Sequence, residues 1–484
     1  MIYKTILCLL LFTLPLSIFT QNTFEIIYST LRDEGVIQIV EIDNGDFLAV
    51  GFEGDFSQPD QLKGLILFVS NVGDTSVYRY TLGDTSLFFT QIAVLENNHY
   101  LLFGSAYIPA DQSQQLLTME LDSKLSIVDF NLIQKDGYRA FYQHNILPAN
   151  CGYYLVCNAI HVLGESHILL AKIKTDGDTL CTKIISDLGG GCSISLIEYS
   201  SDSSSLWLLG RGCSSAIGER IIFDTNFNFK YNHLLPNQAK NYFDLKWVSD
   251  TSLLFVSDYT HDGTPQDDDI GISEVDSSFT QDDIVFIGSE DTMDYPAAYC
   301  AFDFTNADTI FFAGTNNVIP AFFPQVKNHI MIGCLNRNLE QKSMLLYGGD
   351  AYYFATNIIC TSDGGCLISS RRYDYEVQDN EYDVLFLKLS KHDIITVSDN
   401  QIDPGPRKMD VFSNLGNGWI YINSNIHDGQ FLLFNSIGVL HKNIKISFGL
   451  NFIQTKNLSN GLYSYVILKD SKTIDSGKWI KTSN

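Results

Sequence analysis

The stretch Asn97-Asn98-His99-Tyr100-Leu101-Leu102-Phe103-Gly104 decides the fold of this chain, because its pattern recurs six more times. Each copy has turn-forming residues, a short apolar run typical of a strand, and a small residue at its end. The copies end at positions 51, 104, 157, 210, 257, 314 and 370, which lie 53, 53, 53, 47, 57 and 56 residues apart. Such a period indicates a repeat architecture.

Each repeat offers three further strands around this one. An aromatic or β-branched run precedes the turn, as at 242–248, and a nearly all-apolar run follows, as at 167–173. A short turn such as 176–178 then leads to a fourth strand, as at 180–184. Four strands in about fifty residues is the pattern of a propeller blade. The sequence therefore predicts an all-β chain with a seven-bladed β-propeller over residues 21–400. The small residue ending each second strand is expected to let adjacent sheets approach closely.

Residues 24–28 (Phe-Glu-Ile-Ile-Tyr) form an extra apolar strand before the first repeat. An open ring of blades leaves sheet edges exposed. We therefore expect this strand to pair within the last blade and close the ring. The alternative is an unpaired lead-in that merely covers the first blade.

The N-terminus reads as a secretory signal peptide over residues 1–20. Lys4 gives the positive start, apolar runs follow at 6–12 and 14–19, and Gln21 opens a polar mature chain. The apolar run is too short for a transmembrane helix, and no later stretch is apolar enough, so we expect no membrane-spanning segment in the mature chain. The net charge of −25 argues against binding nucleic acid.

A separate unit is expected after the repeats. Residues 401–407 (Gln-Ile-Asp-Pro-Gly-Pro-Arg) break the pattern and read as a linker. Beyond it, four apolar runs predict the strands of a small β-sandwich over residues 401–484, at 419–422, 429–434, 450–453 and 463–468.

Three motifs in this unit resemble the C-terminal sorting (Por) domain of type IX secretion. They are Leu-Phe-Asn-Ser-Ile-Gly at 433–438, Leu-Ser-Asn-Gly-Leu-Tyr at 458–463, and Gly477-Lys478. The opening departs from the family, since Phe-Ser-Asn-Leu at 412–415 stands where Pro-Asn-Pro is usual. The alternative is an unrelated small β-domain. The matching positions are Gly438, Gly461, Tyr463, Gly477 and Lys478.

This resemblance implies where the protein goes and what handles it. Residues 401–484 would be read by the type IX secretion machinery after Sec export, and the protein would be extracellular or on the outer cell surface. The repeats also resemble those of exported propellers that carry the same tail. Neither likeness implies an activity.

The default ligand surface is the face of the propeller where long loops join the second and third strands of each repeat, which we call the long-loop face. Aromatic rings and arginines there would suit stacking on sugar rings or gripping a peptide. Packing against neighbouring blades is the alternative. The candidates are Tyr107, Tyr259, Phe322, Phe323, Arg371, Arg372 and Tyr373.

Acidic residues gather on the same face, most closely at Asp267, Asp268 and Asp269. Hard cations prefer several carboxylate and carbonyl oxygens, so this run predicts a Ca²⁺ site, and Ca²⁺ is the one cofactor that these loops would suit. Solvated acidic loops are the alternative. Cysteines give no zinc spacing, although Cys360 and Cys366 flank a turn and could face each other across a hairpin.

Enzyme motifs are weak along the chain. It has no Gly-x-Ser-x-Gly or His-Glu-x-x-His, and residues 200–207 match the Asp-box of sialidase propellers only in part. We therefore favour a secreted or cell-surface, non-catalytic binding or scaffold propeller, with a surface glycan or a protein as its ligand. An extracellular glycan-cleaving enzyme using acids of the long-loop face is the alternative, because carboxylate separation is unreadable from sequence. A structural part of a surface assembly is a third possibility.

Overall fold

A computed structural model describes residues 23–481 apart from gaps at 56–57, 187–192, 212–217, 235–238, 261–266, 279, 290–291, 307, 378–380, 396–408, 415–418, 425–428, 436–437, 448, 460 and 470–471. The predicted signal peptide (1–20) and linker (401–407) lie outside the described residues. No helix within the described ranges is long and apolar enough to cross a membrane.

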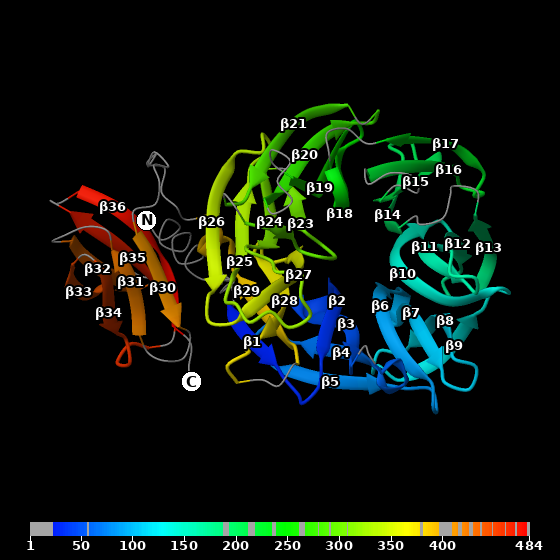
Figure 1. Ribbon diagram of the computed structural model, residues 1–484, viewed down its shortest axis with the longest axis horizontal. Coiled ribbons are helices and arrows are strands. Elements are labelled where there is room, and N and C mark those ends of the chain that lie inside the picture. The colour runs from blue at the N-terminus through cyan, green and yellow to red at the C-terminus, as the bar shows by residue number, and fades with distance from the viewer. Residues whose placement is uncertain are drawn as a thin grey trace, which may run out of the picture.

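Seven antiparallel sheets follow one another around a ring in the described part of the chain (Figure 1). Each consecutive repeat makes one sheet, so the predicted all-β, seven-bladed propeller is confirmed. The first three blades contain β2 (Glu34–Glu41), β3 (Phe47–Glu53), β4 (Lys63–Val69) and β5 (Thr75–Tyr80); β6 (Ser86–Val94), β7 (Tyr100–Ile108), β8 (Ser113–Leu121) and β9 (Ile127–Ile133); and β10 (Tyr138–Ala149), β11 (Gly152–His161), β12 (Ser166–Ile173) and β13 (Thr179–Ile185).

The next three blades repeat this order. They contain β14 (Ser193–Tyr199), β15 (Ser205–Arg211), β16 (Gly218–Asp224) and β17 (Phe229–Leu234); β18 (Ala239–Ser249), β19 (Ser252–Thr260), β20 (Asp268–Asp276) and β21 (Gln281–Ile287); and β22 (Tyr295–Pro296), β23 (Phe302–Asn306), β24 (Thr309–Thr315), β25 (His329–Leu335) and β26 (Gln341–Gly348). Short 3-10 turns at Asp43–Gly45, Pro59–Gln61 and Glu96–Asn98 and the helix α2 (Lys391–Ile395) complete the ring.

The seventh blade is closed by the N-terminal strand. It combines β27 (Tyr352–Cys360), β28 (Cys366–Tyr373) and β29 (Asp383–Leu389) with β1 (Phe24–Tyr28) as the outermost strand. β1 runs antiparallel to β29, with Phe24 opposite Lys388 and Tyr28 opposite Val384. The expectation that residues 24–28 pair within the last blade is confirmed.

Glu34 lies where the ring closes, and the pKa of its carboxyl group is unusually high. It is fully buried, and the Thr30 hydroxyl donates a hydrogen bond to it. Burial raises the pKa of Glu34 to about 8, with Asp383 and Glu53 adding to the rise and the Thr30 hydrogen bond opposing it. Because the folded pKa exceeds the ordinary 4.5, the contribution of Glu34 to stability is fully present below about pH 4.5 and is lost as pH rises toward 8.

We expect the free energy of unfolding to fall by about 2 kcal/mol more in the wild type than in Glu34→Gln between pH 6 and pH 8, at about 1.4 kcal/mol per pKa unit. Denaturant titrations at the two pH values measure this difference. Equal pH dependence in the two proteins would contradict a raised pKa at Glu34.

The small residue that ends the second strand allows close approach between blades at Gly314, as expected, since a Cβ there would lie 2.3 Å from Ile270 Cδ1 of the fifth blade; at Gly51 and Gly104 its role is different. The inner strands shift register at matching places, such as Val36/Gln38 and Phe89/Gln91. A Cβ on Gly51 would lie 1.8 Å from the carbonyl oxygen of Gly35, and one on Gly104 would lie 2.1 Å from that of Phe88. At these positions the expectation of close approach between blades was wrong. The bulge on the inner strand of the same blade is what excludes a side chain.

Gly51→Ala should therefore lower the free energy of unfolding by about 2–3 kcal/mol, since backbone must move to admit the methyl group. Gly83→Ala is the control, because nothing lies within 4 Å of its Cβ position and only its φ of +62° is unfavourable. We expect about 1 kcal/mol there. Urea titrations that gave equal losses would refute the proposed clash.

Two further sheets make a small sandwich, drawn from orange to red in Figure 1. Its core combines side chains of both sheets, including Ile420, Ile453, Phe431 and Trp479. The predicted β-sandwich fold is thus confirmed. One sheet contains β30 (Met409–Asn414), β31 (Trp419–Ser424) and β34 (Gly449–Gln454), and the other β33 (Leu440–Ile446), β32 (Gly429–Asn435), β35 (Gly461–Lys469) and β36 (Lys472–Lys481).

The cysteines within the described ranges are all free thiols. Cys360 and Cys366 lie directly opposite each other on β27 and β28, as their flanking of the turn suggested, and are not bonded. Burial raises the pKa of Cys360 to about 12 and that of Cys366 well above its usual value. Both thiols are therefore protonated and unreactive at neutral pH.

Candidate functional site: the central channel and its mouth

A cavity of about 360 Å³ lies at the centre of the ring, between the innermost strands. Every blade contributes to its wall, from β2 through β27. The sixth blade does so irregularly, because residues 297–301 lie opposite the single residue Ala313. The extra residues reach across to the seventh blade, where Tyr299 N donates to the Thr356 carbonyl at 2.9 Å and Ile358 N donates to the Cys300 carbonyl at 2.9 Å.

One ion network holds this irregular segment beside the channel. Lys246 on β18 places Nζ 3.0 Å from Asp303 Oδ1, 2.7 Å from the Phe302 carbonyl and 3.7 Å from Asp244 Oδ2. Asp244 Oδ2 in turn accepts a hydrogen bond from Ala301 N at 3.1 Å. Burial opposes the charged amine, yet Asp244, Cys300 and Asp303 outweigh it and raise the pKa of Lys246. The network joins the fifth and sixth blades.

An aromatic group lies on the long-loop face where the sixth, seventh and first blades meet. We name it the mouth cluster; it comprises Phe322, Phe323, Tyr352, Arg371, Tyr373, Tyr375 and Tyr382. The Phe323 ring centre lies 5.3 Å from those of Tyr373 and Tyr382, and the Arg371 guanidinium lies 4.0 Å from the Tyr382 ring. Tyr352, Tyr373 and Tyr382 are buried, so these offset and cation–π contacts pack the cluster and hold Arg371 in place.

Two members of the cluster, Phe322 and Arg371, have groups that other side chains of the described residues leave available. Phe322 is 86 % exposed, while its carbonyl accepts a hydrogen bond from the Tyr382 hydroxyl. Arg371 has no carboxylate within 4 Å among the described residues. The strand β27 carries both Tyr352 of the cluster and Asn357 of the channel wall, so the cluster lies at the end of one of the innermost strands.

The structure brings together some of the sequence candidates and separates others. Phe322, Phe323, Arg371 and Tyr373 meet in the mouth cluster, as expected for one ligand surface. Tyr107 lies apart on β7 of the second blade. Tyr259 lies on β19 of the fifth, is buried and contacts Ser273 Oγ at 3.2 Å. Tyr352 and Tyr382 were missed, because each follows directly after a loop and no motif marks it.

Arg372 is placed differently from its neighbour Arg371. Successive strand residues point to opposite faces, so Arg372 turns to Asp350 and Asp374, each at 3.1 Å, and to Asp383 at 3.7 Å. Its side chain is 12 % exposed. This arrangement ties Asp350, Asp374 and Asp383 together rather than offering the guanidinium to a ligand.

The aspartates proposed for Ca²⁺ do not form a coordination shell. Asp268 is buried and accepts a hydrogen bond from the Thr260 hydroxyl at 2.6 Å. Asp267 precedes β20, while Asp268 and Asp269 are its first two residues and are directed to opposite faces of the sheet by strand alternation. Within the described ranges, no group of three His, Cys, Asp or Glu side chains could hold a metal ion.

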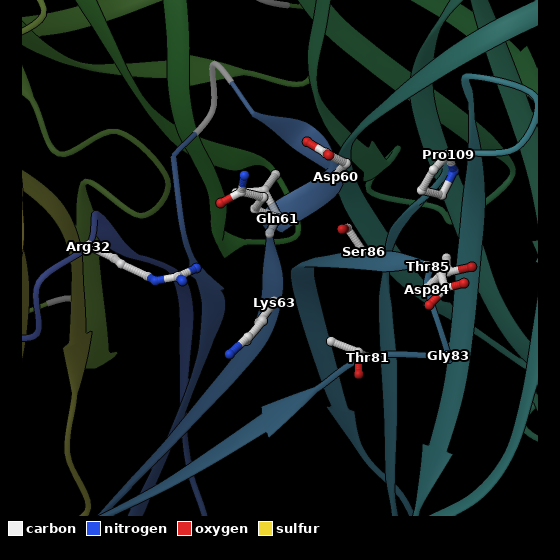
Figure 2. Close-up of a pocket in the computed structure, with 11 residues that line it drawn as sticks. Arg32, Asp60, Gln61, Lys63, Thr81, Gly83, Asp84, Thr85, Ser86 and Pro109 are labelled. Atoms are coloured by element: carbon white, nitrogen blue, oxygen red, sulfur yellow. The ribbon is translucent and has the colours of Figure 1, made fainter.

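A second hollow of about 450 Å³ opens on the rim between the first and second blades. Figure 2 shows Arg32 and Lys63 on one side of it and Asp84 and Thr85 on the other. Its charged residues are largely exposed, so water screens them. On the opposite face of the propeller, a basin of about 1160 Å³ is lined by turns, and its Asp363 is paired with Lys388 at 2.8 Å.

The matching positions of the sorting motif have structural roles in the sandwich. Gly438 and Gly461 have φ of +80° and +145°, which disfavour any side chain. A Cβ on Gly477 would lie 2.5 Å from the Tyr465 hydroxyl, so glycine leaves room for that ring. Tyr463 is buried, opposite Trp479, and donates to the Ser459 carbonyl at 2.9 Å. Burial lowers the pKa of Lys478.

Seven blades around a lined channel define this chain as a β-propeller. No family model and no curated protein matches it. Similar solved structures include PorZ, a surface component of the type IX secretion system of Porphyromonas gingivalis (10% identity, TM-score 0.41, 92% of this chain and 59% of PorZ covered). Others are Kuenenia stuttgartiensis hydrazine synthase (12%, 0.45, 74% and 96%) and phage phi92 endosialidase (9%, 0.42, 96% and 80%). This chain thus spans 59% of the length of PorZ, and likenesses this distant carry no argument about function.

Proposed function

We propose that this protein is an exported, non-catalytic binding propeller that holds a surface glycan or a protein ligand at the mouth cluster. The observation that carries the proposal is Arg371, whose guanidinium lies 4.0 Å from the Tyr382 ring with no carboxylate partner among the described residues, while the Tyr382 hydroxyl donates a hydrogen bond to the carbonyl of the exposed Phe322. Exposed rings next to an unpaired guanidinium are typical of binding hot spots. The Arg371 guanidinium is held by its contact with the Tyr382 ring, so little of its order is lost on binding.

The placement of the acids supports binding over cleavage. Asp374 and Asp383 are paired with Arg372, and Asp268 is bound to Thr260. A glycan-cleaving site needs two carboxylates facing one glycosidic bond. These three acids of the long-loop face instead hold loops in place.

The support for export comes from the amino-acid sequence. The signal peptide and the resemblance of residues 401–484 to a type IX sorting domain support an extracellular or outer-surface location, reached through the type IX machinery. The structural roles of Gly438, Gly477 and Tyr463 give a physical reason for those motif residues. Deleting residues 401–484 is expected to leave the propeller in the periplasm of a host with type IX secretion, as cell fractionation would measure. Export at the full-length level would contradict this role.

The test of binding is a glycan-array and polysaccharide-degradation screen of the mature chain, with and without Ca²⁺. We expect retention of a glycan without release of products, and a loss of affinity of about tenfold in Arg371→Ala and in Phe322→Ala. Val377→Ala is the matched control, since Val377 is also highly exposed on the seventh-blade loop. Release of products would contradict the proposed binding module and favour the alternative, a glycan-cleaving enzyme.

A further inference from the structure

Four carboxamide side chains from four different blades line the central channel. Gln38, Gln91, Asn145 and Asn357 each follow directly after the register shift of their inner strand. The repeat therefore places them at the same level of the channel. The corresponding position is Leu196 in the fourth blade. In the fifth it is Asp244.

The protein satisfies only part of the hydrogen-bonding capacity of these amides. Gln38 Oε1 accepts from Ile92 N at 2.6 Å, Asn145 Oδ1 accepts from Ile146 N at 2.8 Å, and Asn357 Nδ2 donates to Ser369 Oγ at 3.0 Å. Gln91 is 8 % exposed, and its amide has no hydrogen-bond partner among the described residues. A carboxamide offers two donors and an acceptor oxygen, so several groups are left for a ligand in the cavity.

The charge and shape of the channel restrict the ligand class. Its charged lining residues, Asp244 and Lys246, lie in one network with each other and with Asp303, which leaves the wall close to neutral. Tyr299 is 47 % exposed and supplies an aromatic face that solvent can reach. A cavity of about 360 Å³ is at the small end of ligand pockets, which run from about 300 to 1,000 Å³.

We propose that the central channel binds a neutral polyhydroxylated ligand, the size of one sugar ring, through the carboxamides of Gln38, Gln91, Asn145 and Asn357. Hydroxyl groups both donate and accept, which matches amides, and the C–H face of a sugar suits the Tyr299 ring. This inference deepens the proposed function, because it makes the channel the subsite for the end of a glycan whose next units would reach the mouth cluster.

Saturation-transfer NMR with glucose, galactose, mannose and N-acetylglucosamine tests the proposal on the mature chain. We expect at least one sugar to bind, and Gln91→Leu to weaken that binding about tenfold, because buried amide groups discriminate strongly for hydroxyls. Gln61→Leu is the matched control, since Gln61 lines the rim hollow of Figure 2 instead, and should leave binding unchanged. Gln91→Met, similar in volume, serves where the leucine variant fails to fold.

The outcomes separate this inference from the proposed function. Sugar binding that is insensitive to the Gln91 variants, or no transfer to any of the four sugars, overturns the channel subsite. Glycan-array binding that is lost in Arg371→Ala but kept in the Gln91 variants would leave the proposed function standing without it. Loss of array binding in both sets supports both.

Discussion

Lys246→Met is expected to lower the free energy of unfolding by about 2–3 kcal/mol, because it leaves the buried Asp244 and the partly buried Asp303 without their cation. The amine donates to Phe302 O at 2.7 Å and to Asp303 Oδ1 at 3.0 Å. All of these partners belong to the seam between the fifth and sixth blades. The loss should therefore appear as a lower midpoint of the whole propeller in chemical denaturation.

Lys174→Met is the control for this substitution. Lys174 pairs with Asp178 at 2.8 Å, but both side chains are exposed, at 39% and 54%. A surface pair of this kind contributes little to stability, because water and salt screen it. The double variant Lys246→Met/Asp303→Asn should recover part of the loss, since it removes one uncompensated charge. Similar losses at Lys246 and Lys174 would refute the buried network.

Deleting residues 23–28 is expected to cost about 5 kcal/mol or more, since it removes the strand that closes the ring. Phe24, Ile26 and Tyr28 pack on the core shared by the first and seventh blades. Half-burying three such side chains contributes about 1 kcal/mol each, and five residues of ladder pairing with β29 are lost in addition. The bared β29 edge should also promote association through strand pairing.

Chemical denaturation measures the loss of stability after deletion of residues 23–28, and light scattering measures the association. Ile26→Ser should reproduce part of the loss of stability, while Ile27→Ser, whose side chain is 44 % exposed, should change it little. An unchanged denaturation midpoint and a monomer after deletion would mean that β1 only covers the blade.

The fold was predictable from the sequence because it repeats. Seven copies of one pattern, each ending in a small residue such as Gly51 or Gly104, fixed the number of sheets. The strand at 24–28 had an evident place once the ring was assumed. The reason for the glycines was not readable, because it lies in bulges on the inner strands, and a bulge leaves no residue signature of its own.

The candidate site was predictable in part. Phe322, Phe323, Arg371 and Tyr373 were chosen for their chemistry on one face, and the structure brings them together, while their role in binding stays a prediction. Arg371 and Arg372 are equivalent in the sequence but differ in the structure, since strand alternation directs them to opposite faces. The adjacent aspartates Asp268 and Asp269 of β20 illustrate the same limit for metal sites, since alternation separates them as well.

The sequence by itself determined the all-β class, the number of blades, the strand that closes the ring and the separate C-terminal sandwich. These depend on local periodicity and turn chemistry, which neighbouring residues encode. Only the tertiary structure decided which side chains meet. The Lys246 network joins residues up to 59 positions apart (244 to 303), the mouth cluster residues up to 60 apart (322 to 382), and the carboxamides of the channel residues up to 319 apart (38 to 357). Their proximity follows from ring closure, and no local pattern records it.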